Sequence, residues 1–250
     1  MKWMWLGFLA ACGTPDSGPT GIAGDDDDGA PTPTDTDLPT GTSDAPGLAM
    51  IFSGTDRVVA DAASLPTGGE ARTVQAWIRT DRADVDQSAV SWGDGIHTFG
   101  MGTHQGRLRV TAGTAEIDGP GMADGRWTHA AVTYDGSTVE LFVDNVSAGT
   151  VDVALDTTAS ELVVGESFDG MVDELRIYGT DRMSSDIGAD ARQELDGDET
   201  GLLLYWSFNG VTASGSGERV QNEATATGPS ADGLTEGSDT TPGPVQSDAW

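Results

Sequence analysis

The residue whose position most demands a chemical partner is Asp173. It alternates with Leu175 and Ile177 along a predicted strand, so the three side chains should share one buried face. A carboxylate in such a position must be hydrogen-bonded, paired with a cation such as Arg176 or Arg57, or bound to a metal ion. Ca²⁺ is the candidate metal, because it takes its ligands from carboxylate and main-chain carbonyl oxygens.

The second residue with distinctive chemistry is Cys12, the only cysteine of the chain. It follows a positive charge at Lys2, an apolar run over Trp3–Ala11 and small residues directly before the thiol. This layout predicts an export signal with a small-residue cleavage site, and the apolar run is too short to span a bilayer. It also resembles the lipobox of bacterial lipoproteins, which implies that Cys12 is acylated and becomes the new N-terminus. The alternative is a soluble protein whose apolar start is accidental.

Composition limits the partners of the exported part. The 250 residues carry a formal net charge of −29, from 41 acidic and 12 basic side chains. Such a surface repels nucleic acid and anionic membrane surfaces, so we expect neither as a partner beyond the lipid anchor. With Cys12 lipidated no disulfide is possible, and the 35 glycines favour many turns over a helical bundle.

The chain divides into four parts. After the leader (1–12), residues 13–46 consist largely of Gly, Pro, Thr, Ser, Ala and Asp, and are predicted to be a disordered, extended tether. From Gly47 to Gly210, short apolar runs recur between Gly, Asp and Ser clusters, which is typical of an all-β sandwich. Residues 211–250 form a C-terminal extension that either completes the sandwich or remains outside it.

Several elements of this sandwich are readable from periodicity. Thr73–Arg79 should be a strand with Val74, Ala76 and Ile78 facing the core and Trp77 on the other face. Thr138–Val143 alternates in the same way, and Asp135–Ser137 before it predicts a hairpin turn. Ser184–Leu195 contains the one plausible short helix, with a Ser or Asp cap.

Five segments together resemble the laminin-G-like, concanavalin-A-like jelly-roll domains of secreted and surface proteins. The segments are 50–58, 73–78, 125–136, 141–144 and 168–178, and the strings WTHAAVTYDG and FDGMVDELRIY are the most specific. The resemblance implies a jelly-roll β-sandwich that binds glycans or proteins. One segment departs from the family order: Gly201–Gly210 looks like the strand that often precedes the first segment. We expect it to close the sandwich beside Leu48–Phe52; the alternative is a truncated second repeat.

The resemblance also implies a structural calcium that joins the first turn to the penultimate strand. The usual aspartate ligand corresponds to Asp173. The first turn would contribute the carbonyls of Ser53 or Gly54, together with Asp56.

Catalysis is not expected. The family's hydrolases carry a Glu-x-Asp-x-x-Glu pattern, and no predicted strand of this chain has it. The acidic residues between Glu194 and Glu199 fall in a glycine-containing loop. Lyase chemistry needs a His/Tyr pair, whereas His97 and His104 flank a hairpin and His129 is expected to pack within a strand.

The remaining candidate for ligand contact is Trp92, because sugars stack on exposed aromatic rings and SWGDG places this ring at a turn. The alternative is that Trp92 caps the core, where Trp77, Trp127 and Trp206 are expected. The sequence therefore predicts a non-catalytic, lipid-anchored protein of the cell envelope that displays a binding or adhesion domain. Gly13 after the cysteine favours the outer membrane. The alternatives are a structural envelope module and an extracellular glycan hydrolase or lyase.

Overall fold

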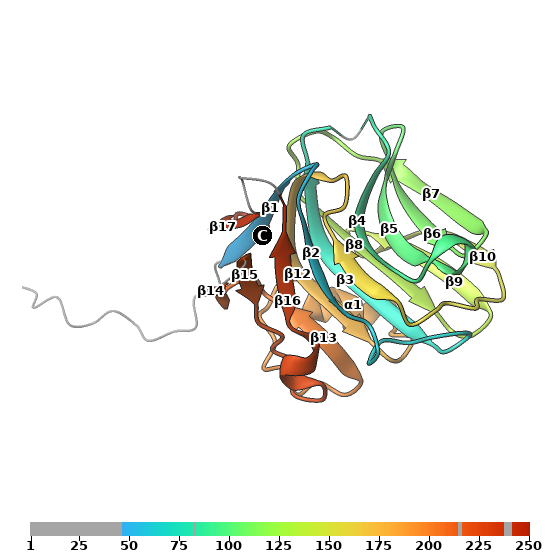
Figure 1. The fold of residues 1–250 in the computed structure, drawn as a ribbon. Coiled ribbons are helices and arrows are strands. Elements are labelled where there is room, and N and C mark those ends of the chain that lie inside the picture. Colours follow the sequence, from blue (N-terminus) through green and yellow to red (C-terminus); the bar gives the residue numbers. More distant parts are fainter. Residues whose placement is uncertain (1–46, 83, 215–216, 238–241) are drawn as a thin grey trace, which may run out of the picture. The chain divides into compact units, whose positions relative to one another are not determined.

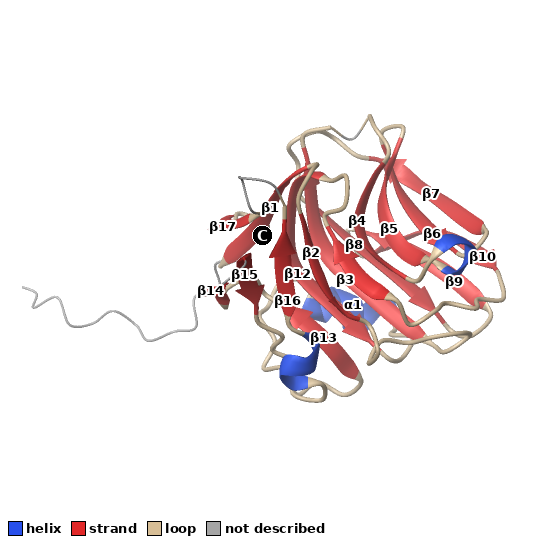
Figure 2. Cartoon of the chain, in the orientation of Figure 1, coloured by secondary structure: helices blue, strands red, loops and turns tan. Residues whose placement is uncertain are grey.

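The computed structural model of the protein describes residues 47–82, 84–214, 217–237 and 242–250. The expected leader, Cys12 and the tether lie outside these residues. The described part is almost entirely β-structure, and its two antiparallel sheets pack face to face (Figures 1 and 2). The all-β jelly-roll sandwich predicted from the sequence is thus confirmed.

Sheet A contains eight strands in the described residues, in the order β10-β9-β8-β3-β12-β1-β17, with β13 also paired to β12. Its strands are β1 (Leu48–Ser53), β3 (Arg72–Thr80), β8 (Thr128–Tyr134), β9 (Thr138–Val143), β10 (Val146–Asp152), β12 (Asp169–Tyr178), β13 (Leu202–Trp206) and β17 (Gly243–Gln246).

Sheet B contains nine strands in the described residues, in the order β14-β15-β16-β2-β11-β4-β5-β6-β7. They are β2 (Arg57–Asp61), β4 (Gln87–Trp92), β5 (Phe99–His104), β6 (Arg107–Ala112), β7 (Ala115–Gly121), β11 (Glu161–Val164), β14 (Val211–Ser214), β15 (Gly217–Val220) and β16 (Gly233–Glu236). Two 3₁₀ helices, η1 (Gly95–His97) and η2 (Gly228–Ala231), lie in the connections.

The core fills the space between the sheets. Val74, Ala76 and Ile78 of β3 are fully buried there, as their alternation predicts. The core also holds a cation, Arg72, whose guanidinium donates to the carbonyls of Glu70 (2.9 Å) and Gly68 (2.8 Å). Three aromatic rings lie within 5.8 Å of it, and burial lowers the pKa of Arg72 to about 10.

The hairpin between β8 and β9 forms as predicted. Asp135 accepts hydrogen bonds at Oδ1 from the main-chain N–H groups of Ser137 and Thr138, both at 2.7 Å. This Asx-type arrangement satisfies the N–H donors of the turn with a side chain of the turn itself. The turn was therefore predictable from the local sequence Asp135–Ser137.

The late strand Leu202–Trp206 joins sheet A, but it pairs with β12 and not with β1. Leu204 lies opposite Ile177, whereas β1 takes the first half of β12, with Met50 opposite Val172. Strands β1 and β13 therefore follow one another along the same edge of β12. The chain after Gly210 enters both sheets: β17 pairs with β1, and β16 pairs with β2 (Figure 1).

One helix, α1 (Ser184–Asp190), lies on the outer face of sheet A, where Ile187 packs on Ala131 and Phe142. The helix is shorter than the predicted segment, and the expected Ser or Asp cap is wrong. Met183 occupies the N-cap position without a side-chain hydrogen bond. Burial of Ile187 rather than capping thus anchors this helix.

A β-bulge in β12 changes the face on which Asp173 lies. Asp173 is opposite Trp77, but Arg176 is opposite Gln75, so one extra residue is inserted. Glu174, with φ = 53°, takes up the inserted position. Leu175 and Ile177 consequently face the core, while Asp173 shares the outer face with Trp77. The shared face expected for Asp173, Leu175 and Ile177 is wrong for this reason.

Candidate functional site

Three residues on neighbouring strands form a row across the outer face of sheet A. Asp173 of β12 is opposite Trp77 of β3, and Trp77 is opposite His129 of β8. Cross-strand partners project from the same face of a sheet, so their side chains are neighbours. The Trp77 and His129 rings are 5.3 Å apart between centroids, at an angle of 60°.

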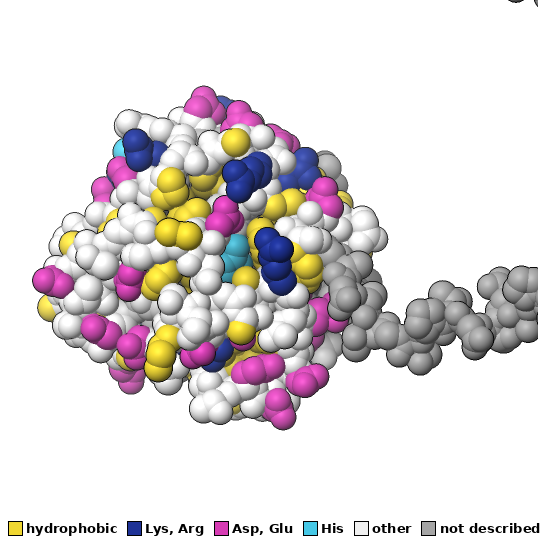
Figure 3. Space-filling model, turned by 180° about the vertical axis from the view of Figure 1, so that it is seen from behind, with side chains coloured by type: hydrophobic (Ala, Val, Ile, Leu, Met, Phe, Trp, Pro, Cys, Tyr) yellow, Lys and Arg dark blue, Asp and Glu magenta, His cyan; other side chains and the backbone are white. Residues whose placement is uncertain are grey.

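A cleft of about 430 Å³ opens above Trp77 and His129 of this row. It is lined by Trp77, Arg126, Trp127, His129, Asp144, Asn145, Gly188, Ala191, Arg192 and Ala249. Figure 3 shows a histidine side chain within a hollowed part of this face, with arginine side chains beside it. The cleft thus combines aromatic walls with amide, imidazole, guanidinium and carboxylate groups.

Trp77 ties the floor of the cleft to the segment after α1. Its indole N–H donates to the carbonyl of Ala191 at 2.6 Å. This bond satisfies the polar atom of a ring that packs on Ala49, Trp127 and Ala249. It also fixes the main chain next to Arg192.

Asp144 and Asn145 form the two-residue turn between β9 and β10. Their φ angles of 47° and 64° are typical of a type I′ hairpin, in which Asp and Asn are tolerated. One oxygen of Asp144 accepts from the His129 main-chain N–H (3.1 Å), and the other accepts from Arg126 (3.0 Å). Asn145 contacts α1 so closely that a Cβ on Gly188 would lie 2.3 Å from its Nδ2.

His129 lies at the bottom of the cleft with 3% of its surface exposed. Neither ring nitrogen has a hydrogen-bond partner within the described part of the chain. Burial lowers the pKa of His129 to about 3, and the charges of Arg176 and Arg192 contribute to the lowering. At neutral pH the ring is therefore uncharged, so that one of its nitrogens is a donor and the other an acceptor.

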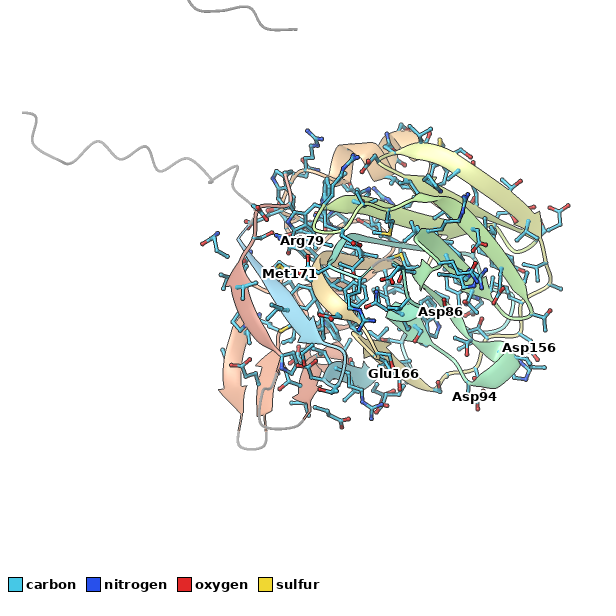
Figure 4. The ribbon with its side chains drawn as sticks, turned by 90° about the horizontal axis from the view of Figure 1, so that it is seen from above. Arg79, Asp86, Asp94, Asp156, Glu166 and Met171 are labelled. Atoms are coloured by element: carbon cyan, nitrogen blue, oxygen red, sulfur yellow. The ribbon has the colours of Figure 1, made fainter. Side chains whose placement is uncertain are left out.

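Ala249 of the C-terminal segment lines the cleft, and its neighbours in sequence contact residues at the cleft and beside it. The indole N–H of Trp127 donates to Asp248 at 2.6 Å, and Arg79 approaches the same carboxylate at 3.6 Å. Trp250 lies 6.1 Å from Trp77 between ring centroids. Figure 4 shows Arg79 beside Met171, its cross-strand partner on β12.

The residues expected to share one calcium ion lie in two places. Ser53, Gly54 and Asp56 are together in the first turn, where Asp56 accepts from the Ser53 main-chain N–H at 2.7 Å. Ser53 is opposite Asp169, four residues before Asp173 on the same strand. Asp173 instead accepts hydrogen bonds from the hydroxyl of Ser247 and from the N–H of Glu174. No cluster of three or more His, Cys, Asp or Glu side chains suited to a metal occurs among the described residues.

Trp92 is buried rather than exposed, which corrects its role as an expected sugar platform. Only 1% of its surface is accessible, and its N–H donates to the carbonyl of Pro66 at 3.1 Å. Its ring packs on Phe99 at 5.1 Å between centroids. This burial agrees with the alternative prediction, in which Trp92 caps the core.

The acidic loop between Glu194 and Glu199 uses its carboxylates for its own structure. Glu199 accepts from the N–H groups of Asp196 and Gly197, both at 3.0 Å, and Glu194 accepts from Asn209 at 2.9 Å. These contacts give both carboxylates a structural role in the loop. They do not support a catalytic role for it.

Sequence reasoning missed most of the cleft. Trp77 and Trp127 are buried as expected, but they belong to a separate cluster on the outer face of sheet A and not to the central core. The one available signal was the phase of Trp77, which places it among the polar side chains of its strand. Arg126, Asn145 and Arg192 carried no such signal.

The fold is that of a two-sheet antiparallel β-sandwich domain. A model of the concanavalin A-like lectin/glucanases superfamily matches residues 52–188, and the chain belongs to this family. The laminin-G-like resemblance of the sequence is therefore confirmed.

Solved structures with a similar fold include a protein of Bacteroides ovatus ATCC 8483 that is provisionally described as carbohydrate binding. It shares 19% identity with a TM-score of 0.61, over 79% of this chain and 61% of its own length. Domain 4 of an extracellular arabinanase from Geobacillus stearothermophilus, solved with arabinotriose, has 20% identity and a TM-score of 0.48, over 58% and 76% of the two chains. A heptameric pentraxin from Limulus polyphemus has 16% identity and a TM-score of 0.48, over 57% and 81%.

The chain thus spans about three fifths of the Bacteroides protein. No curated protein sequence matches it. Among the described residues, no helix has the length and apolar character needed to cross a bilayer.

Proposed function

We propose that this protein is a non-catalytic glycan-binding domain displayed on the cell envelope, with the cleft above Trp77 and His129 as its binding site. The observation that carries the proposal is the imidazole of His129, which is buried at the bottom of an open cleft with both nitrogens unpartnered. A buried polar group without a partner is costly, and a bound hydroxyl would supply the missing hydrogen bonds.

The surroundings of His129 suit a sugar. Trp127 and Trp77 provide apolar walls for the C–H faces of a pyranose or furanose ring. Asn145 is held against α1 and offers an amide to ring hydroxyls. A small-ligand site is usually a preformed cleft with apolar or aromatic walls and a small number of polar groups, and this cleft has these elements. The carbohydrate-binding description of the Bacteroides protein supports this reading at the level of the fold.

The test is a glycan array followed by calorimetry on the best hit. His129→Phe keeps an aromatic ring but removes both nitrogens, so binding should weaken at least about tenfold while the Tm is retained. His97→Phe is the matched control, since His97 lies in η1 and does not line the cleft. An array without hits, or an unchanged affinity in His129→Phe, contradicts the proposal.

The non-catalytic part of the proposal has its own test. Incubation of the protein with each glycan that it binds should release no reducing ends and no unsaturated products. Time-dependent release that survives further purification would identify an enzyme instead.

Display on the envelope rests on Cys12. We infer that the cysteine carries the lipid and that the domain lies outside the cytoplasm. Gly13 after the cysteine favours the outer membrane as the membrane that holds the lipid. Metabolic labelling with a palmitate analogue should mark the wild-type chain and not Cys12→Ser. The serine variant should also leave the membrane fraction; equal membrane retention of both chains contradicts the lipid anchor.

A further inference from the structure

Positive charge is scarce in this protein, and most of its arginines are paired with carboxylates. Seven arginines of the described part form ion pairs with carboxylates: Arg57, Arg79, Arg109, Arg126, Arg176, Arg182 and Arg219. In a chain with a net charge of −29, carboxylates are available almost everywhere. Four other arginines, Arg72, Arg82, Arg107 and Arg192, form no ion pair among the described residues, and Arg72 and Arg107 donate to main-chain carbonyls instead.

Among these four arginines, Arg192 is the one that lines the cleft. It is exposed, and it forms neither a hydrogen bond nor an ion pair with any described residue. Its backbone is fixed, because the preceding carbonyl of Ala191 accepts the indole N–H of Trp77 at 2.6 Å. The main chain that carries Arg192 is therefore held at the cleft by the same bond that orients Trp77.

The other charges of the cleft lining cancel. Arg126 is paired with Asp144, whose second oxygen is occupied by the main-chain N–H of His129. His129 is uncharged, since burial lowers its pKa to about 3. Two arginines and one aspartate thus leave one uncompensated positive charge in the lining, and that charge is on Arg192.

The electrostatic effect of Arg192 reaches the bottom of the cleft, because its charge is one of the causes that lower the pKa of His129. An anionic substituent placed between the two would meet a guanidinium fork and a neutral imidazole N–H. This pair of donors suits a carboxylate or a sulfate, whereas a neutral hydroxyl would leave the charge of Arg192 uncompensated.

We propose that the glycan bound in this cleft is acidic, and that Arg192 binds the carboxylate of a uronic acid or the sulfate of a sulfated sugar. This inference rests on the proposed glycan-binding function and narrows it to one class of ligand. The negative surface of the rest of the protein then selects against polyanions that do not enter the cleft.

The experiment is an array that presents uronate-containing, sulfated and neutral oligosaccharides on the same sugar backbones. An oligogalacturonate, its carboxyl-reduced form and a sulfated galacto-oligosaccharide of the same length make up one such set. The wild type should bind at least one acidic member about tenfold or more tightly than its neutral counterpart. Which acidic member binds distinguishes carboxylate from sulfate.

Two variants then assign the preference to the residue. Arg192→Gln should lose the preference for the acidic member while retaining the affinity for the neutral one and the Tm. Arg82→Gln is the matched control, since Arg82 is an exposed arginine of the loop after β3 that does not line the cleft. It should leave the preference intact.

The outcomes separate the two proposals. Equal or tighter binding of neutral members, or an acidic preference that survives Arg192→Gln, overturns the acidic ligand but leaves glycan binding in place. No binding to any member of the array contradicts the proposed function itself.

Discussion

Ser247 donates a hydrogen bond to the carboxylate of Asp173, and this contact joins the C-terminal segment to the middle of sheet A. The N–H of Glu174 occupies the other oxygen of the same carboxylate at 2.8 Å. Asp173 is 1% exposed, so these two bonds replace the water that the group has in the unfolded chain. The C-terminal segment, whose Ala249 lines the cleft, is thus held in place by a hydrogen bond to a buried carboxylate.

Stability should depend on pH through Asp173. Burial raises the pKa of Asp173 to about 7, although the hydrogen bond from Ser247 opposes the rise. A folded-state pKa above the unfolded value means that the native state holds the proton more tightly. The contribution is therefore fully present below about pH 4 and is lost as the pH rises through about 7. We predict that the Tm falls between pH 5 and pH 8.

Asp173→Asn should flatten this part of the pH profile, because the amide keeps the shape of the side chain and does not ionise. Thermal melts at four pH values between 5 and 8 measure the effect. Asp84→Asn, at an exposed loop position, should reproduce the wild-type profile. Equal slopes for Asp173→Asn and the wild type would falsify this account.

Trp92→Ala should destabilise the fold rather than weaken ligand binding. The substitution leaves a large cavity against Phe99 and removes one of the rings that face Arg72. The free energy of unfolding should fall by about 3–5 kcal/mol, as for other buried aromatic residues. Urea denaturation measures this value. Trp250→Ala, at a half-buried ring, should cost clearly less, and a mild effect of Trp92→Ala would contradict its place in the core.

Gly188→Ala tests the contact between α1 and the β9–β10 turn. The new methyl group would lie 2.3 Å from Nδ2 of Asn145, so the amide must move out of its place in the cleft. Alanine is favoured over glycine within a helix, which offsets part of the cost. We predict a Tm within a few degrees of the wild type and a weakened affinity for the glycan. Ala189→Gly, one residue further along α1, is the control and should lower the Tm without affecting binding.

Calcium binding stays a prediction of the sequence, and the geometry says which residue it should depend on. Both carboxylates are buried, but Asp56 lines a surface hollow together with Gly54, whereas Asp173 has both oxygens occupied. We predict that calcium raises the Tm relative to EGTA, that Asp56→Asn removes the rise and that Asp173→Asn retains it. Calorimetric melts in both buffers check this. A wild type without any calcium effect eliminates the ion from the account.

Much of the sandwich was predictable because its strands follow simple periodicity. Thr73–Arg79 alternates with a period of two, and the turn Asp135–Ser137 satisfies its own donors locally, so both could be read without tertiary information. The bulge at Glu174 could not. One inserted residue reverses the alternation after it, and the insertion is decided by pairing with β3, which lies about a hundred residues earlier in the chain.

The cleft was not predictable for a related reason. His129, Asn145 and Arg192 come from a strand, a hairpin turn and the segment after a helix, and no spacing along the chain connects them. Trp92 was a candidate for ligand contact, with the core as its alternative, because a Gly–Asp turn follows it directly. The turn begins only after the strand, however, and the ring itself points between the sheets.

The pairing of β1 with β17 has a consequence for how the domain is made. Leu48 lies opposite Gln246, so the first and last strands of the described sandwich are neighbours. During synthesis or export, the edge of β1 that receives β17 stays open until nearly two hundred further residues have emerged. Contacts of such long sequence separation form late and slow the folding reaction. Completion of sheet A is therefore a final step, and a chain interrupted shortly before residue 243 would expose an adhesive strand edge.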